Sequence, residues 1–204
     1  MSATYKIRVF AARLAPNEMF HTSQVLAFGT RWAVDKALSR LVQSRVLHRL
    51  GRGLFIQAGP DALLVTAEAA ARYKAAAFGN QIVEHATDTG HRLGIQSRPN
   101  PAPTFATSGC SSSFLFNGET RVYFKRASAR KRQLSQTKMG DVVRALWQLG
   151  RKNCDLEDIR TANISPGRSD RLQLPSLAGL MPTWLHCRFR WHDAPRPKLD
   201  AKTA

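Results

Sequence analysis

The chain has 204 residues, 43% of them hydrophobic, and a formal net charge of +17 at pH 7. This length and apolar content suffice for a buried core in one large or two small domains, so the composition predicts a folded protein. No run of about 18 apolar residues occurs, and the opening MSATYKIRVF lacks the long apolar core of a signal peptide. We therefore expect a cytoplasmic protein that neither spans nor binds a membrane.

The positive charge is distributed unevenly along the chain. Residues 1–60 hold nine Lys or Arg against two Asp or Glu, residues 61–118 hold four against four, and residues 119–204 hold eighteen against eight. Two basic regions around a neutral middle predict two cationic surfaces that attract a polyanion, of which nucleic acid is the first candidate. A solubilising surface is the alternative, although such surfaces normally mix both signs.

The first thirty residues predict two short helices. Residues 5–14 carry apolar side chains at helical spacing, and Pro16 ends that helix. Thr22 or Ser23 can cap a second helix, which Gly29 can end. The pattern is two helices joined by a breaker.

Residues 30–44 predict a third, amphipathic helix with Thr30 as its cap. The predicted core face comprises Val34, Ala37, Leu38, Leu41 and Val42. The opposite face collects Arg31, Trp32, Asp35, Lys36, Ser39, Arg40 and Gln43.

The turn Gly51-Arg52-Gly53 follows that helix and lies between two apolar arms. Glycines at a turn flanked by apolar arms indicate a β-hairpin. A phosphate-cradling loop is disfavoured, because the strand-to-helix glycine pattern and G-x-x-x-x-G-K-S/T are both missing from the sequence. Three helices followed by a hairpin predict a winged helix-turn-helix domain at residues 1–60.

Residues 61–192 predict a second α+β domain, helical with a small antiparallel sheet. Thr66 caps an alanine-rich helix that ends at Gly79, and residues 81–95 are expected to be helical. The prolines of RPNPAP, residues 98–103, predict an extended connection. Strands are expected at 104–107 and 114–116, and Asn117-Gly118 is a strong hairpin signal.

Further helices are expected in the last third of the chain. Residues 140–150 predict an amphipathic helix, a short helix can start at Asp155, and residues 175–187 can form a last helix despite Pro182. Residues 193–204 are polar with two prolines and are expected to be a disordered tail.

Patterns that would indicate catalysis or a metal site are weak. The six histidines show no metal-ligand spacing, and Cys110, Cys154 and Cys187 lack the paired spacing of a zinc site, so we expect buried or idle thiols and no metal or cofactor. The loop Ser108–Ser113 lacks the G-x-S-x-G elbow of a nucleophile. A nuclease or transferase needs clustered carboxylates or histidines, whereas the acids are scattered singly. We therefore expect a protein without catalytic residues.

The third helix and the hairpin predict a DNA-binding surface. A helix fits the major groove of DNA, where side chains near its N-terminus reach base edges while basic neighbours hold phosphates. The alternative is that these charges only solvate the outer face of a core helix. The predicted DNA-binding residues are Arg31, Trp32, Lys36, Ser39, Arg40, Arg49 and Arg52.

A second basic run lies between residues 120 and 140, which hold no acidic residue. This run could clamp a second stretch of phosphates, receive an acidic protein, or be a solvated loop, and charge alone does not decide among the three. Its members are Arg121, Lys125, Arg126, Arg130, Lys131, Arg132 and Lys138.

Three segments together resemble a known family: VDKALSRLVQSRVLHRLGRGLF, FATSGCSSSFLFNGETRVYFKRASARK and GDVVRALWQLGRKN. Over about residues 5–160 the chain resembles the AbiEi-like antitoxins of type IV toxin-antitoxin systems and their short relatives in bacteria and mobile elements. The resemblance implies a winged helix-turn-helix that represses its own operon and a second domain that counters a nucleotidyltransferase-like toxin. It also implies that the DNA-facing helix and wing bear Lys36, Ser39, Arg40, Arg49 and Arg52.

The sequence thus predicts an antitoxin-type transcriptional autoregulator whose partners are double-stranded DNA and a protein toxin. The alternative is a protein-binding inhibitor of a mobile element, which blocks a conjugation component through the basic second domain. DNA affinity and the activity of the second domain alone would discriminate between them.

Overall fold

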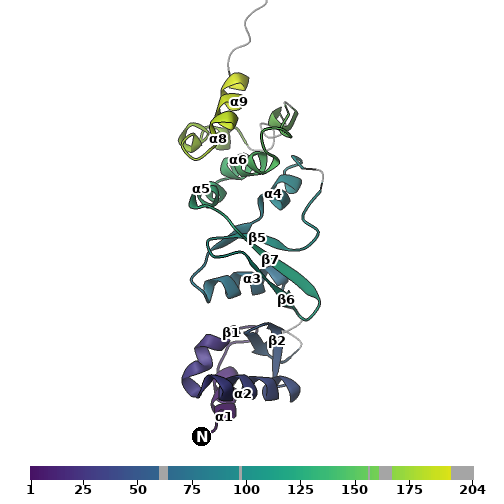
Figure 1. The fold of residues 1–204 in the computed structure, drawn as a ribbon, viewed down its shortest axis with the longest axis vertical. Helices are drawn as coiled ribbons and strands as arrows, with labels where there is room; N and C mark the ends of the chain where they lie inside the picture. Colours follow the sequence, from purple (N-terminus) through teal and green to yellow (C-terminus); the bar gives the residue numbers. More distant parts are fainter. Residues whose placement is uncertain (60–63, 97, 156, 161–166, 194–204) are drawn as a thin grey trace, which may run out of the picture. The chain divides into compact units, whose positions relative to one another are not determined.

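The computed structural model describes residues 1–59, 64–96, 98–155, 157–160 and 167–193. The chain folds into two compact units, each built from two stretches of sequence: Met1–Val83 with Pro101–Ala127, and Glu84–Asn100 with Ser128–Ala204 (Figure 1). This division differs from the expected one at 1–60 and 61–192, because the N-terminal hairpin shares a core with the strands that follow it.

The first unit begins with six elements in the first 57 residues. They are α1 (Ala3–Ala12), β1 (Met19–His21), the 3-10 helix η1 (Thr22–Phe28), α2 (Arg31–Gln43), β2 (Leu47–Gly51) and β3 (Leu54–Gln57). The capped third helix is confirmed, since the N–H of Ala33 donates to Thr30 Oγ1 at 3.3 Å. The hairpin is also confirmed. Strand β1 was not expected, and the second helix is a 3-10 helix that His21 caps.

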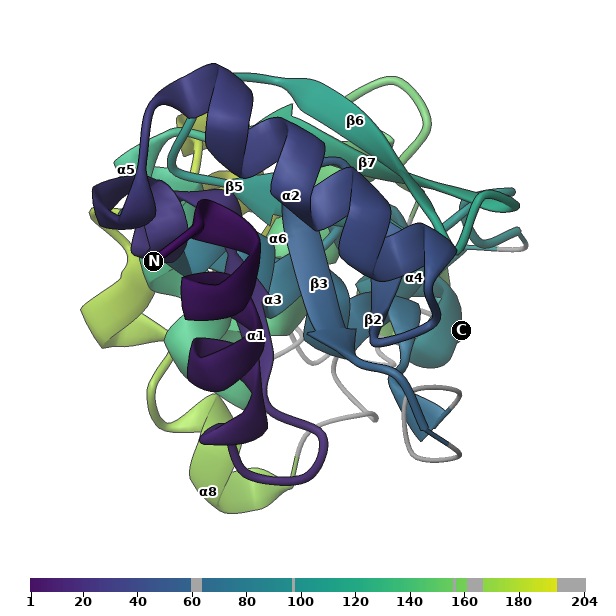
Figure 2. The same cartoon turned by 90° about the horizontal axis from the view of Figure 1, so that it is seen from below.

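Strands β1, β3 and β2 form an antiparallel sheet in that order, in which Phe20 pairs with Phe55. Because side chains alternate across a strand, Phe55 joins the core beneath α1 and α2, whereas Leu54 and Ile56 point into a second core. The sheet is therefore buried on both faces. Figure 2 shows α2 crossing this sheet next to α1.

The second core of this unit lies between the first sheet, helix α3 (Ala67–Ala76) and a second sheet. The second sheet has the order β4 (Ile82–Glu84), β5 (Thr104–Thr107), β7 (Thr120–Arg126) and β6 (Ser112–Phe116). The expected hairpin is present, and both of its turn residues have positive φ, 50° at Asn117 and 78° at Gly118. Strands β5 and β7 are parallel, however, so the sheet is mixed and the purely antiparallel prediction was wrong.

The N-terminal hairpin is docked on this second sheet. A Cβ on Gly51 would lie 2.8 Å from Phe114 Cδ2, the N–H of Asn117 donates to the carbonyl of Leu50 at 3.0 Å, and His48 Nε2 lies 3.1 Å from Asn117 Oδ1. Gly51 is thus required by close packing, whereas Gly53 has a φ of +75° that favours glycine. This contact is why the first unit extends beyond residue 60.

The second unit is helical among its described residues. Its elements are α4 (Ala86–Arg92), α5 (Ala129–Gln133), η3 (Leu134–Gln136), α6 (Lys138–Leu149), α8 (Arg168–Arg171), η4 (Pro175–Leu177) and α9 (Thr183–Asp193). Helix α6 matches the predicted amphipathic helix, and its buried residues, among them Val142, Val143 and Leu146, lie in the core of this unit.

Two sequence predictions for this part of the chain need correction. Residues 82–84 form a strand, so the helix expected at 81–95 is reduced to α4. The last helix begins after Pro182 instead of at Pro175, since a proline inside a helix removes a backbone hydrogen bond. The short helix expected from Asp155 is present where the structure describes it, at 157–160, and the N–H of Asp158 donates to Asp155 Oδ1 at 2.8 Å. The predicted tail lies outside the described residues from position 194 onward.

A buried arginine joins α4 to α6 within the second unit. Arg144 is 3% exposed and donates to the carbonyl of Glu84 at 2.6 Å, to Thr89 Oγ1 at 3.0 Å and to Asp141 Oδ1 at 2.8 Å. Arg92 lies outside this contact and pairs with Glu84 at 2.9 Å. Two acids, Glu84 and Asp141, and two arginines thus share one cluster of hydrogen bonds and ion pairs.

No helix in the described part of the chain is both long and apolar enough to cross a membrane.

Candidate nucleic-acid interface

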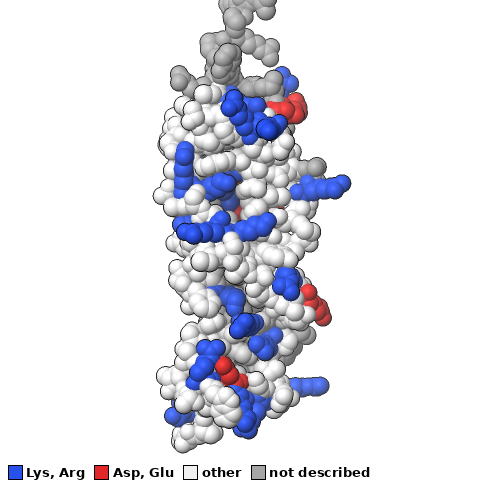
Figure 3. Space-filling model, viewed as in Figure 1, with Lys and Arg blue, Asp and Glu red and all other residues white. Residues whose placement is uncertain are grey.

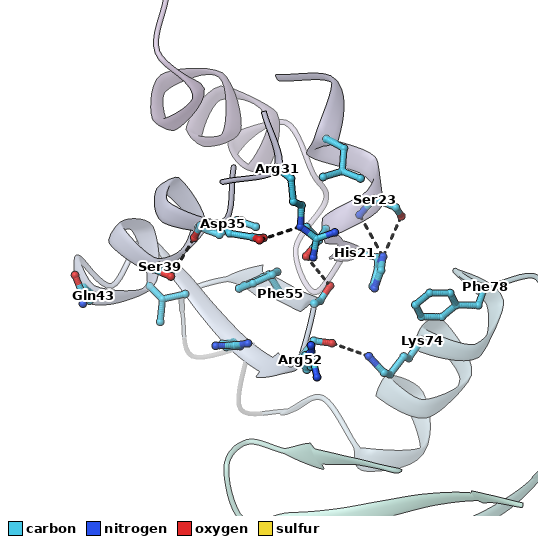
Figure 4. A pocket seen from close by; sticks show the side chains of 16 residues that line it. His21, Ser23, Arg31, Asp35, Ser39, Gln43, Arg52, Phe55, Lys74 and Phe78 are labelled. Carbon is cyan, nitrogen blue, oxygen red and sulfur yellow. Dashed lines mark hydrogen bonds and ion pairs between the residues drawn. The ribbon is translucent and has the colours of Figure 1, made fainter. Parts of the chain in front are cut away.

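A groove of about 670 Å³ opens on the first unit. Its walls are η1 and α2 on one side, and the β2–β3 hairpin and α3 on the other. Figure 4 shows Arg31, His21, Arg52 and Lys74 around this opening, with Phe55 on its floor. The groove therefore joins the predicted DNA-facing helix to the predicted wing.

The charged side chains that line the groove are almost all basic. Four cations, Arg31, Arg49, Arg52 and Lys74, stand against the single carboxylate of Asp35. That carboxylate accepts a hydrogen bond from Arg31 Nε at 2.9 Å, one helical turn away on α2. Three of the four lining cations therefore have no acidic partner within the groove.

Lys74 is held among other cations. Its Nζ donates to the carbonyl of Arg52 at 2.6 Å and lies 5.4 Å from the centre of the Phe114 ring. Partial burial, together with the positive charges of Arg52 and Arg49, lowers the pKa of Lys74 below its ordinary value. Lys74 is thus close enough to Arg52 and Arg49 to be repelled by both, and an anion in the groove would relieve that repulsion.

His21 lies at the end of the groove where η1 begins. Its Nδ1 accepts the N–H of Ser23 at 3.2 Å and lies 2.9 Å from Ser23 Oγ. Its ring meets Phe78 edge-on, with the ring centres 4.9 Å apart. Burial, Lys74 and Arg31 lower the pKa of His21, so the neutral ring is favoured at neutral pH.

The structure divides the seven predicted DNA-binding residues into two groups. Arg31, Ser39, Arg49 and Arg52 line the groove. Trp32, Lys36 and Arg40 are exposed on α2 outside its lining. Trp32 is 70% exposed, and Lys36 Nζ lies 4.5 Å from the centre of its ring. Helix α2 thus presents an exposed surface beside the groove as well as one wall of it.

Sequence reasoning missed His21, Lys74 and Phe78. His21 belongs to an unexpected three-residue strand, and Lys74 is one basic residue in an alanine-rich helix. Lys74 carries no local signal, because the fold brings it to the hairpin from a separate helix. The cap of η1 is the one local clue: the N–H of His21 donates to Gln24 Oε1 at 2.8 Å in a capping box.

The second basic run falls in both units. Arg121, Lys125 and Arg126 lie on β7 in the first unit and are exposed. The other four residues, Arg130, Lys131, Arg132 and Lys138, belong to the second unit. Figure 3 shows that Lys and Arg greatly outnumber Asp and Glu on one face of the molecule.

Two members of the run are engaged inside the second unit. Arg130 donates to the carbonyls of Leu180 and Met181, and its guanidinium lies 5.3 Å from the ring centre of Trp147. Lys131 lies 4.8 Å from the same ring, and burial lowers its pKa. These two side chains therefore pack α5 against its own unit, which reduces the charge that the run can offer to a partner.

The described residues offer neither a metal site nor a disulfide. They contain no cluster of three or more His, Cys, Asp or Glu that could hold a metal ion. Cys110 and Cys187 are exposed free thiols and Cys154 is a buried one.

Residues 12–165 match a protein family described as a family of unknown function, DUF6088. The chain belongs to this family. No curated protein and no solved structure matches the chain. The matched stretch includes α2, the hairpin and α3, so the whole groove lies within the family's domain.

Proposed function

We propose that the first unit is a winged helix-turn-helix that binds double-stranded DNA, and that the protein is a non-catalytic, antitoxin-type autoregulator in the cytoplasm. The element order supports this proposal. A helix, a strand, a 3-10 helix and the helix α2 precede the β2–β3 hairpin, and β1 pairs with β3 at the other side of the sheet. In this arrangement α2 is the recognition helix and the hairpin is the wing.

The observation on which the proposal rests is the basic groove beside the exposed side of α2. A phosphate backbone that followed the groove would meet Arg49, Arg52 and Lys74, three cations without an acidic partner there. Phosphate contacts of this kind fix the position of a protein on the duplex but carry no sequence information. They would place α2 at the neighbouring major groove.

The exposed side of α2 would then read bases. Lys36 can donate to guanine, and Ser39 can contact a base or a phosphate. Trp32 can pack against the apolar parts of the bases in the DNA major groove. Arg31 is already bonded to Asp35, so its role is shared between that pair and the backbone. Arg40, which lies on α2 outside the lining of the protein groove, can contact the DNA backbone.

Autoregulation and a protein toxin as partner rest on the resemblance to AbiEi-like antitoxins. The second unit would supply the toxin-contacting surface. A protein-binding inhibitor that acts through the basic run alone has less support, because Arg130 and Lys131 are engaged within the second unit.

The proposal is tested by titrating the full-length protein into a labelled duplex and following fluorescence anisotropy between 50 and 200 mM salt. The double variant Arg49→Ala, Arg52→Ala should bind more weakly. The negative slope of log K against log salt should become shallower by about 1.8, or 0.9 for each lost phosphate contact. Arg151→Ala, Lys152→Ala removes the same charge from exposed side chains of the second unit and serves as the matched control. An unchanged slope in the groove variant would contradict the proposed wing.

A further inference from the structure

We propose that His21 and Lys74 complete, with Arg52, a binding site for one phosphate of the DNA backbone, in which His21 acts as a neutral N–H donor through Nε2. This inference rests on the proposed function, since the phosphate is a phosphodiester of the bound duplex. The two new members of the site, His21 and Lys74, lie outside the recognition helix α2 and the hairpin that forms the wing. His21 ends β1, and Lys74 belongs to α3.

The hydrogen bonds of His21 determine where its ring proton lies. Nδ1 accepts the N–H of Ser23, a donor that cannot reverse its role. A neutral imidazole has one donor and one acceptor nitrogen, so Nε2 must carry the proton. Adding a second proton at Nδ1 would break the cap of η1. Burial and the charges of Lys74 and Arg31 favour the same neutral form.

The Nε2–H donor of His21 points at the hairpin turn. A Cβ on Gly53 would lie 2.9 Å from Nε2, so the glycine leaves this nitrogen uncovered. No hydrogen-bond acceptor is found for Nε2 among the residues that the structure describes. A donor at the edge of a groove that has no acceptor within the protein is available to a ligand that brings one.

The neighbouring groups are donors as well. Lys74 Nζ uses one of its three protons on the carbonyl of Arg52 and keeps the others. The Arg52 side chain is exposed at the same turn. Figure 4 shows His21, Lys74 and Arg52 near one another in the lining of the groove. Phosphate oxygens are acceptors only, so they match this set of donors, and the bonds to Lys74 and Arg52 are charge-assisted.

The geometry separates two roles within one site. Lys74 and Arg52 supply charge, and their bonds to phosphate release counterions from DNA. His21 supplies direction without charge, because its neutral ring donates one hydrogen bond. Its pKa is lowered by burial, by Lys74 on α3 and by Arg31 on α2, so the surroundings of His21 favour the neutral ring.

The test compares two substitutions of His21 in the full-length protein, using duplex binding by anisotropy and thermal unfolding. His21→Asn keeps an oxygen that can accept the Ser23 N–H and cap η1, but has no donor in the position of Nε2. We expect an unchanged melting temperature, affinity about tenfold weaker, as for loss of a hydrogen bond to a charged group, and an unchanged salt slope. His21→Gln can place its amide nitrogen near that position, so it should bind within about threefold of wild type but melt at a lower temperature.

The variant Lys74→Met tests the cationic member of the site. Methionine keeps apolar contact with Phe78 and Phe114 while removing the charge. Affinity should therefore fall, and the negative slope of log K against log salt should become shallower by about 0.9. If His21→Asn binds as tightly as wild type, His21 is only a cap and the inference is overturned. A shallower slope of log K against log salt in His21→Asn would mean that His21 binds as a cation, which also overturns the inference. Wild-type protein that binds no duplex would overturn the proposed function itself.

Discussion

Replacing Arg144 by methionine tests how the second unit is held together. The substitution keeps an unbranched apolar chain but removes three hydrogen bonds, to the Glu84 carbonyl, Thr89 and Asp141. Truncating one partner of a buried ion pair costs about 3–5 kcal/mol, because the other charge remains buried without its partner. Since the side chain of Asp141 is 24% exposed, we expect a loss near the lower limit, about 3 kcal/mol in the free energy of unfolding.

Urea denaturation followed by circular dichroism measures this loss, and pH gives an independent check. Burial raises the pKa of Asp141 even though Arg144 and Arg92 oppose it, and removal of Arg144 raises that pKa further. A carboxyl whose pKa is higher in the folded than in the unfolded state destabilises the fold above that pKa and ceases to do so once protonated. The loss caused by Arg144→Met should therefore shrink between pH 7.5 and pH 5.

The double variant Asp141→Asn, Arg144→Met removes both charges and should recover part of the lost stability. A loss below about 1 kcal/mol in Arg144→Met, or an equal loss at both pH values, would refute the reasoning that a buried, paired charge joins α4 to α6.

Three further perturbations concern the first unit. Gly51→Ala should cost about 1–3 kcal/mol in urea denaturation, because its Cβ would overlap Phe114, whereas Gly59→Ala, with no atom within 4 Å, should be neutral. Trp32→Ala should leave the melting temperature unchanged, since the side chain is 70% exposed, but weaken duplex binding in anisotropy titrations; full binding would remove Trp32 from the interface. Because the pKa of His21 is lowered in the fold, the stability that it contributes is present above pH 6.5 and is lost as pH falls below that value. Thermal unfolding of wild type should therefore become more acid-sensitive than that of His21→Asn below pH 6.5, and parallel curves would argue against a neutral His21.

The parts of the fold that the sequence predicts best are those with local signals. Helix α2 has a cap at Thr30 and a continuous apolar stripe, and the hairpin has glycines at its turn. The Asn117-Gly118 turn is also local, since both residues tolerate positive φ. These features depend on neighbouring residues, so a single sequence contains enough information to predict them.

The features that the sequence did not reveal depend on distant pairings. Strand β1 has three residues and is defined by its partners, as in the pairing of Met19 with Ile56. The parallel pairing of β5 with β7 and the docking of Gly51 on Phe114 likewise join segments far apart in the chain. The same holds for the groove, because residues that reach it from distant segments could not be predicted from local sequence. Arg52 was predicted from its turn, whereas Lys74 reaches the same site from another helix.

Binding to the promoter of its own gene tests the central claim most directly. Anisotropy titrations at physiological salt would compare a duplex from that promoter with a scrambled duplex of equal length and composition. An autoregulator should bind the promoter duplex at least about 10³-fold more tightly than the scrambled one, as specific DNA-binding proteins do. Equal affinity for the two duplexes, or binding to neither, would contradict the claim.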